Sequence, residues 1–371
     1  MILSDFRYQD PWAEVNFTLP DFVQQSQAQQ RQDQQAEINR KTLDVLIDKL
    51  SQKDIVGLDH AKAYLRHKYR QNCKANTLKN DFTTITLFLS YLKNCGKTEL
   101  DQIGREDLEA FVEHEQDRGL KIVSVSNRLG SLYAFLRYLI EHDLADAQLL
   151  TRKIKLKVPD ALPRAMDTED VRSLLAVLDD VRNRAMILLL LRSGMRIGEL
   201  LNTKVIDVHL TDKKIMVYEG EKNRKGRAVC ISDDACQALD DWLQKRDAQK
   251  QYLFYGRGGH NMSYNNARVI FKKYLVRAGL EHKDYCLHCL RHTFATELLN
   301  AGMRIECLQQ LLGHSSIEMT LRYARLSDKT REQEYFKAMA IIEGEPIHEP
   351  DQRDHQLPSL FEASQLLTPY A

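Results

Sequence analysis

The sequence predicts a mainly α-helical protein of two domains, with a small β-hairpin in the second domain. Its 371 residues are too many for one small domain, so two are expected. Over most of the chain, apolar residues recur at intervals of three and four, which is typical of amphipathic helices. The stretch 213–232 instead alternates apolar and polar residues on both sides of a polar, glycine-containing turn, which is typical of a hairpin.

The predicted first domain, residues 41–155, follows an N-terminal arm, residues 1–40. The arm contains the stretch QQSQAQQRQDQQAE, which has almost no large apolar side chains and therefore forms either a solvated helix or a disordered segment. Residues 41–155 are expected to form a bundle of four or five helices. Apolar residues at helical spacing support two of these helices: Ile85, Phe88, Leu89 and Leu92 in one, and Leu129, Leu132, Tyr133, Leu136 and Ile140 in the other.

A linker, residues 156–163, leads to the predicted second domain, residues 164–342. It lies within KIKLKVPDALPRAM, which holds three lysines and two prolines and shows little periodicity. The second domain should begin with a helix capped by Thr168 and continue with the apolar run AMILLLL, whose helix ends at Gly194. The hairpin and further helices follow.

The C-terminal tail, residues 343–371, contains a candidate amphipathic helix. Leu360, Ala363 and Leu367 stand at helical spacing after a polar, proline-containing gap. Such a helix needs an apolar surface to cover it, either on the same chain or on a neighbouring subunit.

The composition is that of an ordinary globular protein, with 43% hydrophobic and 28% charged residues. Because the formal net charge is +1, any binding of nucleic acid must come from local basic patches. No run of about 18 apolar residues exists and the N-terminus lacks the order of a signal peptide, so we expect no membrane span. The seven scattered cysteines indicate a reducing compartment, and a cytoplasmic location is expected.

Two arginines stand in sequence contexts that are unusual for surface residues. Arg196 follows the apolar run and precedes two leucines, so it is expected to be partly buried with Glu199 as its partner. Arg291 lies in HCLRH, at 288–292. A guanidinium group matches two oxygens of a phosphate, which makes phosphate a candidate ligand. Taken alone, each arginine is more often a simple surface residue.

Histidines and a tyrosine accompany these arginines. His288 and His292 flank Arg291, and His314 lies in LLGHSS, where a glycine ends one helix and a serine caps the next. Taken alone, His314 is a turn histidine that backbone groups satisfy. Tyr323, nine residues after His314, would usually be a packing residue, but nearby positive charge would favour its phenolate and suit it to nucleophilic attack.

A zinc site is the alternative use of the same region. Cys286 and Cys289 form a C-x-x-C pair close to His282, His288 and His292. A second pair at a finger-like distance is missing from the sequence, and a zinc ion beside two arginines would be electrostatically unfavourable. We therefore expect no metal site and no other cofactor.

The order of these residues resembles the tyrosine recombinase and phage integrase family, which includes the Xer, Cre and lambda-integrase-like proteins. The motifs are GMRIGELL (194–201), EKNRKGRAVCI (221–231), HCLRHTFATELLNAG (288–302) and LLGHSSIEMTLRYA (311–324). The resemblance is specific over 164–342, whereas in 41–150 it rests on the helical pattern alone. It implies a helical core-binding, DNA-binding domain followed by a mixed α/β catalytic domain of the tyrosine recombinase type.

The resemblance implies catalytic roles for individual residues. Arg196 and Arg291 match the arginine pair that grips the scissile phosphate, supported by the neighbouring Glu199, and Tyr323 matches the nucleophile. His288 matches the histidine of H-x-x-R and is expected to accept the tyrosine proton, while His314 hydrogen-bonds the phosphate. The roles of the two histidines are interchangeable at this stage.

The lysine that protonates the leaving 5′ oxygen is expected on the hairpin. Counting back five residues from Arg227 identifies Lys222, and Lys225 is the alternative. Two positions depart from the family pattern. Leu287 and Cys289 flank the histidine of H-x-x-R, where relatives often have a proline and an acidic residue.

DNA contacts are expected in both domains, although a solvated polar face is the ordinary alternative. Helix starts in the first domain offer backbone amides to phosphate. The candidate contact residues are Asn76, Thr77, Lys79, Ser126 and Arg128 in the first domain, and Arg224, Lys225 and Arg227 on the hairpin.

The resemblance implies a site-specific recombinase or integrase that cleaves and rejoins double-stranded DNA through a 3′-phosphotyrosyl intermediate, without metal or ATP. An oligomer, expected to be a tetramer with C-terminal exchange, would act on two DNA sites in integration, excision, transposition or resolution. Accessory proteins are a further class of candidate partner. The alternatives are type IB topoisomerase-like cleavage without recombination, and a DNA-binding accessory protein that depends on a partner for chemistry.

Overall fold

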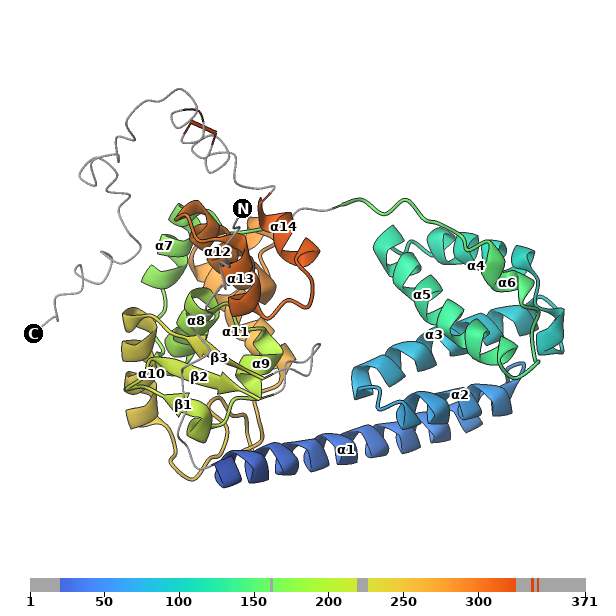
Figure 1. The fold of residues 1–371 in the computed structure, drawn as a ribbon, viewed down its shortest axis with the longest axis horizontal. Coiled ribbons are helices and arrows are strands. Elements are labelled where there is room, and N and C mark those ends of the chain that lie inside the picture. Colours follow the sequence, from blue (N-terminus) through green and yellow to red (C-terminus); the bar gives the residue numbers. More distant parts are fainter. Residues whose placement is uncertain (1–20, 161–162, 219–225, 325–334, 337–338, 340–371) are drawn as a thin grey trace, which may run out of the picture. The chain divides into compact units, whose positions relative to one another are not determined.

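The computed structural model describes residues 21–160, 163–218, 226–324, 335–336 and 339, and it divides into two compact units, Met1–Asp160 and Ala161–Ala371 (Figure 1). The described residues are mainly helical, with one three-stranded sheet in the second unit. The predicted fold class is therefore confirmed. Within the described residues, no helix has the length and apolar character that a membrane crossing requires.

The described part of the first unit is a bundle of helices. Its elements are α1 (Asp21–Ser51), α2 (Leu58–Arg70), α3 (Ala75–Asn94), the 3₁₀ helix η1 (Leu100–Gln102), α4 (Arg105–Asp117), α5 (Ile122–Ile140) and α6 (Gln148–Thr151).

Helix α3 lies at the centre of this bundle, because it packs against α1, α2, α4 and α5. All four residues that define its predicted apolar face are at most 1% exposed: Ile85, Phe88, Leu89 and Leu92. The helical spacing in the sequence therefore identified the side of α3 that faces the core. The corresponding face of α5 is buried in the same way from Leu129 to Leu136, while Ile140 at its end is partly exposed.

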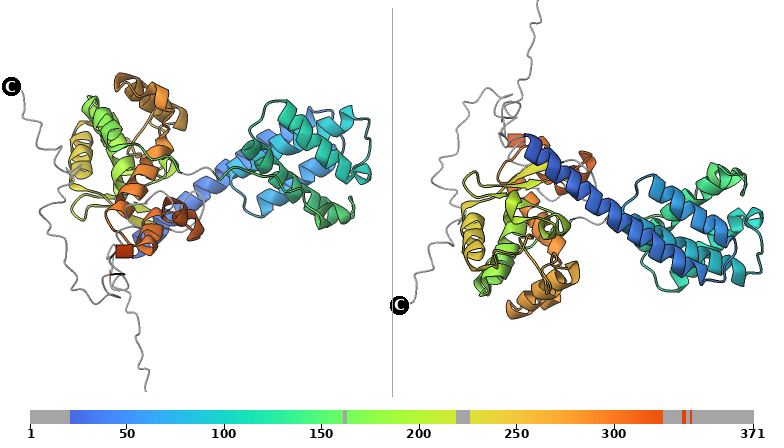
Figure 2. Two further views of the ribbon diagram at one scale, coloured as in Figure 1. Left: turned by 90° about the horizontal axis from the view of Figure 1, so that it is seen from above. Right: turned by 90° about the horizontal axis from the view of Figure 1, so that it is seen from below.

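Helix α1 runs without a break through residue 40, where the sequence suggested a boundary between arm and domain. The sequence left open whether the arm forms a solvated helix or a disordered segment. Residues 21–40 are helical. Figure 2 shows the N-terminal part of α1 extending past the other helices of its unit. Asn39 is 3% exposed, and its Oδ1 accepts a hydrogen bond from the backbone N–H of Ala75 at 3.0 Å. This side chain satisfies one of the free donors at the start of α3 and so ties α1 to α3.

The described part of the second unit combines helices with a small sheet. Its elements are α7 (Thr168–Ala176), α8 (Val181–Ser193), α9 (Ile197–Leu201), η2 (Val205–Asp207), β1 (Val208–His209), β2 (Lys214–Val217), β3 (Arg227–Cys230), α10 (Asp233–Lys245), α11 (Tyr264–Arg277), η3 (Glu281–Lys283), α12 (Leu287–Asn300), α13 (Ile305–Leu312) and α14 (Glu318–Ala324).

The sheet is antiparallel in the order β1-β2-β3, and β2 and β3 are the two strands that the sequence predicted. Ile215 pairs with Val229, and both are at most 2% exposed, whereas Met216 and Ala228 on the other face are more exposed. The alternation therefore predicted the buried face. Strand β1 was not predicted, because two residues are too few to show a period of two.

Helix α8 is the apolar centre of the second unit, packed against α10 and α12 (Figure 1). It ends at Gly194, whose φ of 61° lies in the left-handed region. A Cβ atom on Gly194 would overlap the ring of Phe294 on α12 and would lie 3.1 Å from the side chain of Leu312 on α13. Only glycine lets both helices approach the end of α8 so closely.

We predict that Gly194→Ala will lower the free energy of unfolding, because the new methyl group enters space that Phe294 occupies. Gly279→Ala is the matched control, since Gly279 also has a positive φ of 72° but no atom lies within 4 Å of the place that its new methyl group would take. The Gly194 variant should lose about 1–3 kcal/mol more than the control in denaturant unfolding. Equal losses in the two variants would show that backbone strain, and not close packing, explains this glycine.

Candidate active site

Arg291 is a fully buried cation on α12, with 2% of its surface exposed. Its Nη1 donates to the carbonyl oxygen of Gly194, and its Nη2 donates to that of Leu312 at 2.7 Å. Burial, and then the nearby charge of Arg196, lower the pKa of Arg291 to about 10. The guanidinium group therefore remains charged at neutral pH, held by carbonyl groups at the ends of α8 and α13.

Arg196 precedes the first residue of α9 and is 9% exposed. Its Nη1 donates to Glu199 Oε1 at 2.9 Å, and its backbone N–H donates to Glu199 Oε2 at 2.9 Å. Its Nη2 donates to the carbonyl oxygen of Gly313 at 3.3 Å. The partner that the sequence suggested for Arg196 is thus the one that the structure places beside it.

Arg227, at the start of β3, joins the same cluster. Its Nη1 and Nη2 donate to the two carboxylate oxygens of Glu199 at 3.1 and 2.8 Å, and its Nε donates to the carbonyl oxygen of Leu311 at 3.2 Å. This side chain was a candidate DNA contact, but in the structure it is partly buried and bound to Glu199.

Three consecutive carbonyl groups, those of residues 311–313, therefore accept hydrogen bonds from three arginines. They belong to the last turn of α13, where carbonyl groups have no partner within the helix and carry partial negative charge. Gly313 ends α13 with a φ of 60°, in the left-handed region. The end of one short helix thus gathers cations that come from α12, β3 and the start of α9.

Glu199 offsets part of this positive charge. Burial acts to raise its pKa, but hydrogen bonds and charge from Arg227, together with Arg196, outweigh burial and lower the pKa to about 2. The group is therefore a carboxylate at neutral pH. One carboxylate against three guanidinium groups leaves the cluster with a positive charge that suits an anion.

His314 connects the arginines to α14. Its Nε2 lies 3.0 Å from Nη2 of Arg291, and its Nδ1 lies 2.9 Å from Oγ1 of Thr320. A guanidinium group can only donate, so Nε2 is the acceptor and the proton sits on Nδ1, which donates to Thr320. Burial, and then the charge of Arg291, lower the pKa of His314 to about 3, which keeps the ring neutral.

Tyr323 lies on α14 and is 3% exposed. Its hydroxyl lies 2.8 Å from Nδ1 of His292, and its ring is parallel to that of His314, with 6.3 Å between the ring centres. Burial raises the pKa of Tyr323, and this effect outweighs the opposite effect of Arg291. The nearby arginines do favour the phenolate, as the sequence suggested, but burial disfavours it more strongly, so the pKa of Tyr323 is raised overall.

His292 is in hydrogen-bond contact with the tyrosine hydroxyl. Burial, and then the neighbouring His288, lower the pKa of His292 to about 4, so its ring is neutral and able to accept a proton. The exposed ring of His288 stands edge-on to that of His292, with 4.5 Å between their centres. The sequence contained a signal for this arrangement, because the two histidines are four residues apart and so share one face of a helix.

The remaining predicted site residues belong to the first unit or lie outside the described residues. Lys222, Arg224 and Lys225 all belong to residues 219–225, which the structure does not describe. In the first unit, three candidate DNA contacts are exposed on the first turn and a half of α3: Asn76, Thr77 and Lys79. Ser126 is partly buried, and Arg128 forms an ion pair with Glu115, which is 1% exposed.

Among the described residues, no group of three or more His, Cys, Asp or Glu side chains is placed to hold a metal ion. Cys286 and Cys289 lie side by side, with 3.6 Å between their sulfur atoms, and all seven cysteines are free thiols.

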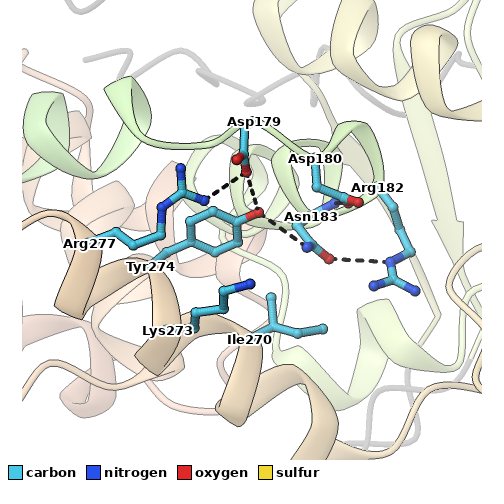
Figure 3. A pocket seen from close by; sticks show the side chains of 8 residues that line it. All are labelled: Asp179, Asp180, Arg182, Asn183, Ile270, Lys273, Tyr274 and Arg277. Atoms are coloured by element: carbon cyan, nitrogen blue, oxygen red, sulfur yellow. Dashed lines mark hydrogen bonds and ion pairs between the residues drawn. The ribbon is translucent and has the colours of Figure 1, made fainter.

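A second concave site lies near the other end of α8 (Figure 3). Asn183 in the first turn of α8 is eleven residues before Gly194, which corresponds to about 16 Å along the helix. In this pocket Asp179 accepts hydrogen bonds from Arg277 Nη1 at 2.9 Å and from the Tyr274 hydroxyl at 3.0 Å, and Asn183 Nδ2 donates to the same hydroxyl at 3.3 Å. These groups satisfy one another and tie α11 to the start of α8, so the pocket has a structural explanation.

Comparison with known proteins connects this arrangement to a family. Residues 164–330 match the model of the Phage integrase family, and residues 58–146 match that of the Phage integrase, N-terminal SAM-like domain. The tyrosine recombinase XerC of Leptospira interrogans serogroup Icterohaemorrhagiae serovar copenhageni (strain Fiocruz L1-130) is 31% identical over 299 residues, which cover 75% of this chain and 92% of the relative. The chain belongs to the tyrosine recombinase family. Cleaving and rejoining DNA by phosphoryl transfer is the activity of this family, so the protein is a DNA strand-transferring enzyme.

Other relatives agree with this assignment. The tyrosine recombinase XerD of Oceanobacillus iheyensis (strain DSM 14371 / CIP 107618 / JCM 11309 / KCTC 3954 / HTE831) is 31% identical over 274 residues, covering 68% of this chain and 90% of the relative. The solved structure of the Tn1549 transposon integrase in complex with transposon right end DNA has a TM-score of 0.66 at 22% sequence identity, and it covers 76% of this chain and 98% of that one. This tyrosine recombinase therefore shares the fold of that integrase.

We predict that Glu199→Gln will destabilise the second unit, because it leaves buried guanidinium groups without a countercharge. The expected loss is about 3 kcal/mol in the free energy of unfolding at pH 7. The folded-state pKa of Glu199 lies below the ordinary 4.5, so its carboxylate stabilises the fold above pH 4.5 and loses this effect as the pH falls towards 2. Denaturant unfolding at pH 7 and pH 3 should therefore show a smaller difference between wild type and variant at pH 3.

The matched control is Glu169→Gln. Glu169 also pairs with an arginine three residues away, Arg172, but its side chain is 80% exposed. Exposed pairs contribute little to stability, so this variant should resemble the wild type at pH 7. Similar losses in both variants would contradict the importance of burial for Glu199.

Proposed function

We propose that this tyrosine recombinase is a site-specific enzyme in which Tyr323 attacks a DNA backbone phosphate and becomes joined to the 3′ end of the cut strand. The observation that carries this proposal is the convergence of Arg196, Arg291 and Tyr323 around the end of α13. His314 connects these groups: its Nε2 accepts a hydrogen bond from Arg291, and its ring lies parallel to that of Tyr323.

The arginines are suited to binding the scissile phosphate. A phosphodiester carries one negative charge, and the pentavalent transition state carries more on its non-bridging oxygens. Arg196 and Arg291 are already charged, buried and held in place, so they stabilise the developing charge without first losing a shell of water. This electrostatic role needs no metal ion. Glu199 binds both Arg196 and Arg227. We propose that Glu199 and Arg227 act by holding Arg196 in position.

Proton transfer at the tyrosine involves the histidines. The phenol must lose a proton as its oxygen forms the bond to phosphorus, and its pKa is raised by burial. His292 Nδ1, at 2.8 Å from the hydroxyl, is the group whose position supports a role as acceptor. His288 remains the acceptor that the family motif suggests, and its ring is exposed on the surface. We propose that His314 changes tautomer when the phosphate binds: its Nδ1 then accepts a hydrogen bond from the Thr320 hydroxyl, and its Nε2 carries the proton and donates to the phosphate.

The bond from phosphorus to the 5′ oxygen breaks in the same step, and that oxygen needs a proton to leave. We propose Lys222 as the donor, with Lys225 as the alternative. The phosphotyrosyl bond conserves the energy of the broken link. A free 5′ hydroxyl therefore attacks it later, restores Tyr323 and rejoins the DNA without ATP.

Exchange of strands between two DNA sites requires more than one active site. We propose that the protein acts as an oligomer, a tetramer on two duplexes, with residues 343–371 contacting a neighbouring subunit. These residues lie outside the described part of the chain. Integration, excision, transposition and resolution use the same chemistry and differ in the DNA sites that are brought together. A type IB topoisomerase-like activity, without a second site, and an accessory DNA-binding role are the competing proposals.

We predict that Tyr323→Phe will abolish covalent protein–DNA adducts, because it removes the attacking oxygen. Adducts are isolated from cells under denaturing conditions, and the attached DNA ends are sequenced. Tyr274→Phe is the matched control, since this tyrosine is also 3% exposed but hydrogen-bonds Asp179 in the pocket of Figure 3. Wild type and control should give sharp peaks of 3′-linked protein. Diffuse peaks that depend on Tyr323 would favour the topoisomerase-like alternative, and equal signals in wild type and Tyr323→Phe would exclude Tyr323 as nucleophile.

A substrate with sulfur in place of the leaving 5′ oxygen separates the proton donor from the proton acceptor. A thiolate leaves without a proton, so Lys222→Ala should cleave oxygen DNA about 10²–10⁴ times more slowly than wild type and recover on sulfur DNA. His292→Gln should be slow on both substrates, because the tyrosine proton must still be removed. If Lys225→Ala, and not Lys222→Ala, recovers on sulfur DNA, Lys225 is the proton donor. If His292→Gln keeps full activity while His288→Gln is slow, His288 is the proton acceptor.

A further inference from the structure

Two thiols lie close together at the start of α12. Cys286 is the residue before the helix, and Cys289 is its third residue. The backbone N–H of Cys286 donates to Cys289 Sγ at 3.3 Å, and the backbone N–H of Cys289 donates to the carbonyl oxygen of Cys286 at 2.8 Å. The two sulfur atoms are 3.6 Å apart. Glutamate at this third position of a helix commonly accepts the N–H of the capping residue, but here the accepting group is an oxidisable sulfur with a second sulfur beside it.

The two thiols differ in their access to solvent. Cys286 is exposed, whereas Cys289 is 3% exposed. Hydrogen bonds from the Cys289 thiol and from the backbone N–H groups of Cys289 and His288 lower the pKa of Cys286 to about 5, and the same contact with burial raises the pKa of Cys289. The positive end of the α12 dipole and the nearby charge of Arg164 act in the same direction on Cys286. The lowered pKa favours the thiolate form of the outer sulfur, which reaches solvent, and the inner sulfur is a buried thiol beside it.

We propose that Cys286 and Cys289 form a redox site that small-molecule disulfides oxidise to an intramolecular disulfide. The Cys286 thiolate attacks one sulfur of the oxidant, forms a mixed disulfide and releases one thiolate. Cys289 then loses its proton to solvent and attacks Cys286 Sγ, which releases the second thiolate. In total, two protein thiols are oxidised to one disulfide and one oxidant disulfide is reduced to two thiols.

The geometry permits this bond. Residues three apart at the start of a helix lie on one face, with Cβ atoms about 5–6 Å apart, and a disulfide requires about 3.5–4.5 Å. The sulfur atoms must approach from 3.6 Å to about 2 Å, which rotation of the exposed Cys286 side chain and a small shift of the first turn supply. Cys286 is exposed, and exposed disulfides are reduced more readily than buried ones, so the bond should be readily reversed.

The disulfide would form within the helix that carries the proposed catalytic groups. His288 lies between the two cysteines, and Arg291 and His292 lie in the next turn. This part of the inference rests on the proposed function: a shift of about 1 Å in catalytic groups costs on the order of 10²-fold in rate, so oxidation should slow DNA cleavage at least about tenfold. The thiol pair would then connect the redox state of the surroundings to recombination.

The first test uses the full chain without DNA, incubated with glutathione disulfide and mapped by peptide mass spectrometry. Wild type should form a Cys286–Cys289 link that dithiothreitol reverses. Cys286→Ser keeps a good helix cap but cannot form the link. Cys307→Ser is the matched control, because it removes an exposed cysteine from α13 and leaves the pair intact. Cys289→Ala should instead accumulate the mixed disulfide on Cys286. Glutathione spread evenly over the exposed cysteines, without the Cys286–Cys289 link, would overturn the proposal.

The second test measures cleavage by reduced, oxidised and re-reduced protein on the recombination site found by adduct mapping. Oxidised wild type should be at least about tenfold slower and should recover on reduction, while Cys286→Ser should not respond to the oxidant. If the reduced protein forms no adduct, the proposed function fails while the mapped disulfide still stands. If the linked protein cleaves as fast as the reduced one, the coupling to recombination is overturned.

Discussion

The last turn of α13 is the feature on which the rest of the site depends. Its three consecutive carbonyl groups, 311–313, bind the guanidinium groups of Arg227, Arg291 and Arg196. A helix end is a rigid set of acceptors with a fixed spacing, so it places three long side chains from distant parts of the sequence with little freedom. The left-handed Gly313 completes the turn, and close packing at Gly194 brings α8 and α12 to it.

Such a cluster of cations is electrostatically unfavourable by itself. Three cations in a partly buried space repel one another, and the lowered pKa of Arg291 reflects both burial and the charge of Arg196. Glu199 reduces the cost by binding two of the guanidinium groups through both of its oxygens. The net charge of the cluster remains positive, and a bound phosphate would offset it. In the proposed function, the same imbalance that limits stability favours binding, and its effect increases as negative charge develops in the transition state.

Helix α12 combines several chemical roles along about two turns. Its first turn contains the thiol pair, the second carries Arg291 and His292, and Phe294 packs against Gly194. The pKa values of the neighbouring histidines are held low by burial and by the arginines, so both His292 and His314 are neutral and each has a defined hydrogen-bond partner. Only a few residues of helical backbone separate the start of this helix from Arg291 and His292.

The sequence by itself determined the mainly helical fold with its small sheet, the buried faces of α3 and of the β2–β3 hairpin, and the motifs that resemble the family. Short-range periodicity is sufficient for these, because it depends only on the spacing of apolar residues along one element. The pairing of Arg196 with Glu199 also followed from a spacing of three residues. Tertiary structure alone decided that Arg227 binds Glu199, that His292 contacts Tyr323, and that burial raises the pKa of that tyrosine. The two contacts join residues 28 and 31 positions apart. The depth at which a group is buried is a property of the packed fold, not of its neighbours in the chain.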